Sequence, residues 1–280
     1  MNTLSKKSLI ASGVITVTIL ASVFLPNYFV YIVLSQFLSI VVLWKYFFDV
    51  PFTRKGVIEK SKFLILPIIF NFGALYLITI FFQSFVKIAF TLVFVGANYY
   101  LWVSLRKVHN LSDRAAIFHR NVLIVLSFMS IFLGSTALFR VFMSLGATGN
   151  RIFFQLLLVI LTFALFYAIS FFLAWENGAD ENLAKLKPYT LVSSLLGAEV
   201  AWVSSIWIVN YPVISTQEKA SLGGTPLPAI LLTIVFYFLW GIVFHKMDKS
   251  LTRRVLTEYF VLTIMFIAVL LMTAKWLPSL

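Results

Sequence analysis

The chain has 280 residues, of which 61% are hydrophobic and 11% charged, with a formal net charge of +12 and no cysteine. Soluble domains carry about 25% charged residues, so the composition excludes an ordinary soluble protein and indicates a membrane protein. The lack of cysteine excludes disulfides, iron–sulfur clusters and thiolate zinc sites. The basic residues lie in short segments between apolar runs, where membrane topology explains them, and we expect no nucleic-acid partner.

Nine apolar stretches are long enough to cross a bilayer, which requires about 20 residues in a helix. We expect transmembrane helices over residues 8–25, 28–48, 63–82, 85–105, 122–145, 152–175, 190–211, 227–244 and 255–275. No stretch between them is long enough for a soluble domain. The predicted fold is therefore an all-α, polytopic membrane bundle that forms a single transmembrane domain over residues 1–280.

The connections between these helices are short. Pro26 and Asn27 form a tight turn between the first two helices, whereas residues 110–121 and 178–188 form longer connections. Each longer connection is compatible with a short helix along the inner headgroup region or with a solvated loop, and Pro188 is expected to end the second one. Their basic residues would favour anionic lipid at the inner surface.

The orientation follows from the distribution of lysine and arginine. With the N-terminus inside, about 17 of the 22 basic residues fall in inner segments, and the outer side holds Lys87, Arg140, Arg151, Lys219 and Lys275. This asymmetry agrees with the positive-inside rule and, with nine helices, predicts a C-terminus outside. We expect the chain in a cytoplasmic or inner membrane.

Sequence motifs of known enzyme chemistry are absent, including a P-loop, HExxH, GxSxG and an EF-hand loop. His109, His119 and His245 all fall in inner segments, so we expect no haem, metal or other cofactor. A lipid-modifying enzyme would have to combine these histidines with Asp113 or Asp248, and no spacing supports such a site.

Polar side chains at membrane depth are few, and they are the candidates for a substrate or ion pathway, because burying them is costly. Glu199 lies near the middle of the seventh predicted helix, and Trp202 shares its face. The remaining candidates are Arg140 near the outer end of the fifth helix, Asn71 one turn after Pro67 in the third, Gln36 in the second and Asn98 in the fourth.

Three hypotheses account for Glu199. It could be ionised and paired with Arg140, protonated and hydrogen-bonded to an amide such as Asn71, or part of a polar cavity used in proton- or cation-linked transport. On the opposite side of the same helix, small residues recur at every fourth position and predict close helix packing. They are Ser193, Gly197, Ala201 and Ser205.

The sequence favours a transporter-like or permease-like bundle for a small or largely apolar substrate, with Glu199 as the candidate for proton coupling. A structural or assembly subunit of a membrane complex is the alternative, and a membrane-embedded lipid-modifying enzyme is the third. A homo-oligomer or a partner membrane subunit is compatible with each of the first two.

Overall fold

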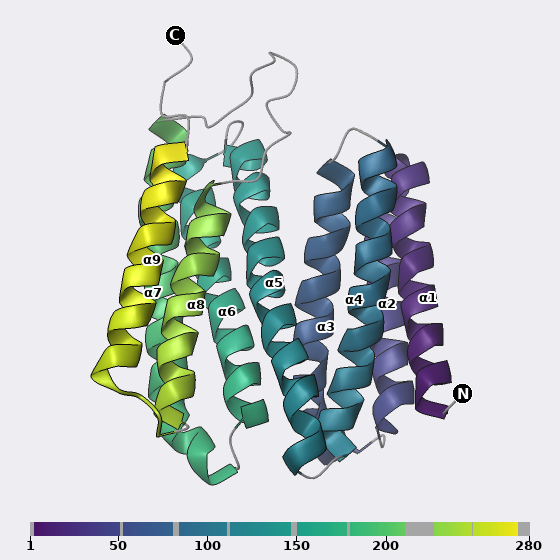
Figure 1. The fold of residues 1–280 in the computed structure, drawn as a ribbon. Coiled ribbons are helices and arrows are strands. Elements are labelled where there is room, and N and C mark those ends of the chain that lie inside the picture. Colours follow the sequence, from purple (N-terminus) through teal and green to yellow (C-terminus); the bar gives the residue numbers. More distant parts are fainter. Residues whose placement is uncertain are drawn as a thin grey trace. The chain divides into compact units, whose positions relative to one another are not determined.

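The computed structural model describes residues 3–50, 53–80, 84–110, 113–146, 150–177, 180–210, 227–247 and 249–273. These residues form nine α-helices and a single turn of 3-10 helix, and they contain no strand (Figure 1). The elements are α1 (Thr3–Phe24), η1 (Pro26–Tyr28), α2 (Phe29–Phe48), α3 (Arg54–Ile80), α4 (Ser84–Asn110), α5 (Asp113–Gly146), α6 (Arg151–Asn177), α7 (Asp180–Asn210), α8 (Leu227–Met247) and α9 (Arg253–Thr273). The predicted all-α fold is confirmed for this part of the chain.

Eight of the helices in the described ranges are long and apolar enough to cross a membrane. These eight helices are α1 to α8. The remaining helix, α9, begins with two arginines and is not among the candidate membrane spans. The chain is therefore a multi-pass membrane protein by the length and composition of its helices.

The helix ends differ from the prediction where polar residues extend a membrane helix. α5 begins at Asp113 and α7 at Asp180, so the two longer connections are largely continuous with the helices that follow them. Pro188 lies inside α7, and its predicted role as the end of a helix is wrong. A proline removes only one backbone donor, and long membrane helices tolerate this loss when neighbouring groups satisfy the freed carbonyl.

The chain divides into two compact units, Met1–Ser130 and Ile131–Leu280, and the division falls within α5. In the N-terminal unit, α1 packs against α2, α3 and α4. Its buried face combines apolar and hydroxyl side chains, and the Oγ of Ser12 donates a hydrogen bond of 2.8 Å to the carbonyl of Val95 on α4. The prediction of one domain over the whole chain stays a prediction.

The corner between α2 and α3 is held by a reciprocal pair of hydrogen bonds. Asp49 ends α2 in the left-handed conformation, with φ of 47°. The Nζ of Lys60 donates to the carbonyl of Phe48 over 2.7 Å, and the indole Nε1 of Trp44 donates to the carbonyl of Lys60 over 2.8 Å. The rings of Phe48 and Phe63 stack with centroids 4.3 Å apart, which adds apolar contact between the two helices.

In the C-terminal unit, α6 and α7 form the most extensive helix pair, α8 packs against α7, and α9 packs against α8. Two aromatic contacts support this arrangement. The rings of Phe166 on α6 and Phe236 on α8 meet edge to face at 5.3 Å. The ring of Tyr259 on α9 lies against the backbone of Gly241 on α8, where a larger residue would collide with it.

Candidate functional site

Three amide side chains occupy the interior of the N-terminal unit, one on each of α2, α3 and α4. Gln36 and Asn71 are completely buried, and Asn98 is 1% exposed. The side-chain oxygen of each has no hydrogen-bond donor among the described residues. Buried polar atoms in proteins are nearly always hydrogen-bonded, and an unpaired acceptor costs about 1–3 kcal/mol.

The amide nitrogens of the same three residues do have partners. The Nδ2 atoms of Asn71 and Asn98 donate to the carbonyls of Pro67 and Phe94, four residues earlier on their own helices, over 2.9 and 3.0 Å. The Nε2 of Gln36 crosses from α2 to α3 and donates to the carbonyl of Asn71 over 3.4 Å. Each nitrogen is thus tied to a backbone carbonyl, and each oxygen remains available as an acceptor.

The packing between helices places Asn98 closer than Asn71 to the end of the unit where α1 begins. The ring of Phe94 meets that of Phe70 on α3 at 5.6 Å, so Asn98 lies about one turn beyond this contact. Trp102 lies one further turn along the same face of α4, and its indole Nε1 is buried without a hydrogen-bond acceptor among the described residues. Nothing in the sequence distinguishes Trp102 as a site residue, because tryptophan is common in membrane helices.

A serine–histidine pair follows at the same end of the unit. The Oγ of Ser104 on α4 lies 3.1 Å from the Nδ1 of His119 on α5, and both residues are buried. The Nε of Arg120 is buried there without a partner among the described residues, and Arg106 lies 3.7 Å from Asp49. Sequence reasoning named His119 but missed Ser104, since only the pairing of α4 with α5 brings them together.

Glu199 lies on the side of α7 away from the buried small residues. Its side chain is exposed on α7, and Trp202, on the same face, is 39% exposed. Arg140 on α5 is buried, and no hydrogen bond or ion pair joins it to Glu199 in the described part of the C-terminal unit. Asn71 belongs to the other unit, so a hydrogen bond between it and Glu199 stays a prediction.

The small residues of α7 lie on its buried side. Ser193, Gly197, Ala201 and Ser205 are all buried, and α6 packs against α7. The Nε2 of Gln155 on α6 donates to the Oγ of Ser205 over 2.6 Å, and the hydroxyls of Ser170 and Ser193 lie 3.4 Å apart. A Cβ at Gly197 would lie 2.6 Å from the ring of Phe166, so this glycine permits close approach of the two helices.

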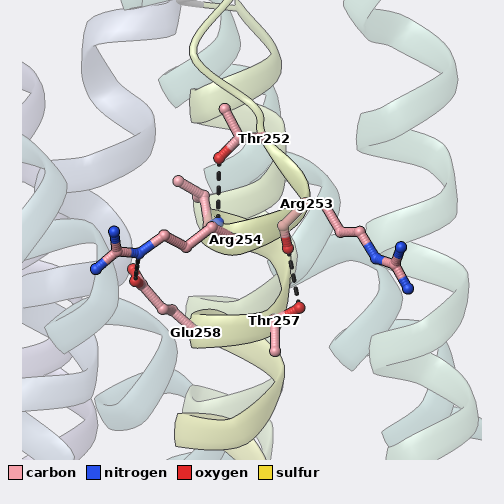
Figure 2. A network of polar contacts seen from close by, with 6 residues as sticks. Thr252, Arg253, Arg254, Thr257 and Glu258 are labelled. Atoms are coloured by element: carbon pink, nitrogen blue, oxygen red, sulfur yellow. Dashed lines mark hydrogen bonds and ion pairs between the residues drawn. The ribbon is translucent and has the colours of Figure 1, made fainter.

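The polar contacts at the start of α9 are exposed and local (Figure 2). The Nε of Arg254 lies 2.9 Å from the Oε1 of Glu258, and the Oγ1 of Thr252 accepts a bond from the backbone N–H of Val255. Figure 2 shows the guanidinium of Arg253 on the opposite side of the helix from this ion pair. Such an i,i+4 pair stabilises a helix by a few tenths of a kcal/mol and carries no chemistry.

Metal or acid–base chemistry finds little support in the described residues. They contain no group of three or more His, Cys, Asp or Glu side chains that could hold a metal ion. His245 is paired with the Oγ of Ser250 at 2.9 Å, five residues away on the surface. The side chains of His109, Asp113 and Asp248 lie outside the described part of the structure.

No family model, curated protein or solved structure matches this chain.

Proposed function

We propose that this multi-pass membrane protein is a transporter or permease, and that the polar interior of its N-terminal unit is the substrate pathway. The observation that carries the proposal is the set of three buried amide oxygens without donors, on Gln36, Asn71 and Asn98. Three helices contribute to this set, which is the way binding sites in helical bundles are built. A substrate or its water can supply the donors that the protein does not.

The chemistry of the pathway limits the substrate. No acidic side chain is buried among the described residues of the N-terminal unit, so an ion with two positive charges would lack counter-charge. The amide oxygens are free to accept hydrogen bonds from a substrate, the indole N–H of Trp102 is free to donate one, and most of the buried side chains of this unit are apolar. These properties favour a small or largely apolar molecule with one or two hydrogen-bonding groups.

The absence of native cysteine allows a direct test, because single cysteines can be introduced without first removing others. Asn71→Cys and Asn98→Cys, in membranes, should react with a membrane-impermeant methanethiosulfonate cation. Leu66→Cys and Phe70→Cys are the matched controls, since both residues are completely buried on α3 but apolar. Labelling of the asparagine positions at ten times the control rate or more supports a hydrated pathway, and equal rates rule it out.

A non-catalytic assembly subunit is the second candidate, and the exposed position of Glu199 favours it. A carboxyl group on the outer face of a membrane helix is costly in lipid and is stabilised when another helix covers it. Proton coupling through Glu199 stays a prediction, which transport measured at several pH values with Glu199→Gln would test. Placement with the N-terminus inside a cytoplasmic or inner membrane, next to anionic lipid, remains part of the proposal.

A further inference from the structure

The end of α2 is attached to each of its neighbours α1, α3 and α4. The ammonium group of Lys7 on α1 lies over the ring of Tyr46, 4.3 Å from its centroid. Lys60 on α3 donates its hydrogen bond to the last turn of α2. The ring of Phe47 meets that of Trp102 on α4, with centroids 4.9 Å apart. One turn of α2 thus contacts three helices at the end of the unit where α1 begins.

The contacts between α2 and α4 cross the middle of these four helices, because α2 and α4 each pack against both α1 and α3. Phe47 and Trp102 are completely buried where their rings meet. Two residues further, Asp49 ends α2, and its Oδ2 lies 3.7 Å from the guanidinium Nη2 of Arg106 on α4. The carboxylate is 74% exposed. A buried ring contact therefore joins the two helices, and an ion pair joins them beyond it, next to the solution.

These contacts lie on the polar face of α4. Asn98, Trp102 and Arg106 follow one another at intervals of four residues, so they share one face of the helix. At 1.5 Å per residue, Trp102 is about 6 Å and Arg106 about 12 Å beyond Asn98. The ring of Phe47 covers this face between the unpaired oxygen of Asn98 and the solution. A molecule bound at Asn98 can leave towards this end only when the two rings separate.

We propose that the contact of Phe47 with Trp102, together with the ion pair of Asp49 and Arg106, is a gate of the substrate pathway. The gate is closed in this structure and opens when the end of α2 moves away from α4. It rests on the proposed function, because alternating access requires each end of a pathway to close in turn. The ion pair suits this role, since an exposed pair contributes little to stability and separates at small cost.

The accessibility of a cysteine behind the gate tests the proposal. Asn98→Cys is treated with an impermeant methanethiosulfonate cation from the side where α1 begins, which is the side from which the exposed Thr53→Cys reacts. Phe47→Ala should raise the labelling rate of Asn98→Cys at least fivefold. Phe37→Ala is the matched control on the same helix, because the ring of Phe37 meets Phe72 on α3 instead, and it should change the rate less than twofold. Equal rates with the two alanine substitutions would overturn the gate.

A charge exchange tests the ion pair and separates opening from misfolding. In the Asn98→Cys chain, Asp49→Arg should raise the labelling rate at least threefold, because two guanidinium groups repel. Adding Arg106→Asp should restore the original rate, because the pair forms again with its charges exchanged. An unchanged rate with Asp49→Arg, or a double exchange that labels as fast as Asp49→Arg alone, would contradict the gate.

The gate and the pathway fail in different ways. Labelling of Asn98→Cys that is fast but does not respond to Phe47→Ala contradicts the gate and leaves the pathway in place. Labelling no faster than that of the buried apolar control Leu66→Cys, from both sides and with Phe47→Ala present, contradicts the pathway and the gate with it.

Discussion

The hydroxyl of Ser104 and the imidazole of His119 form a buried hydrogen bond of 3.1 Å between α4 and α5. In a hydrolase, such a pair would activate the serine, but Ser104 is completely buried and has no route to a substrate in the described structure. The pair is better explained as a link between two helices, in which the imidazole is held in one orientation.

Removing this link should affect stability. Ser104→Ala leaves a buried imidazole nitrogen without its partner, and we expect the free energy of unfolding to fall by about 1–2 kcal/mol. Unfolding in mixed detergent and denaturant micelles measures the change. Glu258→Gln, which breaks the exposed ion pair of Figure 2, is the control and should cost less than about 0.5 kcal/mol. Equal effects of the two substitutions would contradict the proposed role of Ser104.

Gly197 should tolerate no larger residue, because its hypothetical Cβ lies 2.6 Å from Cδ1 of Phe166. We expect Gly197→Val to lower the free energy of unfolding by about 1–3 kcal/mol through overpacking. Gly96→Ala is the control, since nothing lies within 4 Å of a Cβ at Gly96, and alanine should there be neutral or stabilising. Recovery of stability when Phe166→Leu is added to Gly197→Val would identify the ring contact as the cause.

The helices could be predicted from the sequence because a bilayer requires a minimum apolar length, and eight helices of the described ranges meet it. The polar ends of these helices could not be predicted from apolar length. A helix makes its own backbone hydrogen bonds outside the membrane too, so it can continue into a polar segment, as α5 and α7 do. The amides at depth could also be predicted. The exposure of Glu199 could not, because core-facing and lipid-facing sides of a membrane helix are equally apolar, and hydrophobic periodicity does not distinguish them.

The hydrogen bond between Gln155 and Ser205, at 2.6 Å, should contribute measurably to the packing of α6 on α7. Ser205→Ala leaves the amide nitrogen of Gln155 without this acceptor, and the expected loss is about 0.6–1.7 kcal/mol. Ser193→Ala, whose bond to Ser170 is longer at 3.4 Å, should cost less. The ranking can be checked by detergent unfolding of both variants, and a reversed order would show that bond length does not decide the contribution.

Replacing Asn98, whose side-chain oxygen is unpaired, should affect thermal stability differently from replacing an amide that is hydrogen-bonded to another helix. Asn98→Leu removes an acceptor that has no donor among the described residues, together with the bond from Nδ2 to the carbonyl of Phe94, which the helix backbone also satisfies. Purified protein in detergent should therefore be unchanged or more stable in thermal unfolding. Gln155→Leu removes a bonded amide and should lower the midpoint by several degrees. A clear loss of stability in Asn98→Leu would mean that the oxygen is already satisfied in the folded protein, and the proposed pathway would lose its main support.

The predicted orientation can be measured with two exposed positions. In right-side-out vesicles, Asn27→Cys between α1 and α2 should react with an impermeant maleimide, because that turn is predicted to lie outside. Thr53→Cys, between α2 and α3, should react only after the membrane is permeabilised. The reverse pattern would place the basic segments outside and contradict the orientation predicted from lysine and arginine.

The two hydrogen bonds between Lys60 and the end of α2 have a consequence for biogenesis. The ammonium group of Lys60 completes the last turn of α2, and Trp44 in turn holds the backbone of α3, so neither helix end is fully satisfied until the other is present. We therefore expect α2 to remain poorly anchored while the ribosome is still synthesising α3, and the two helices to become stably integrated as a pair rather than one after the other.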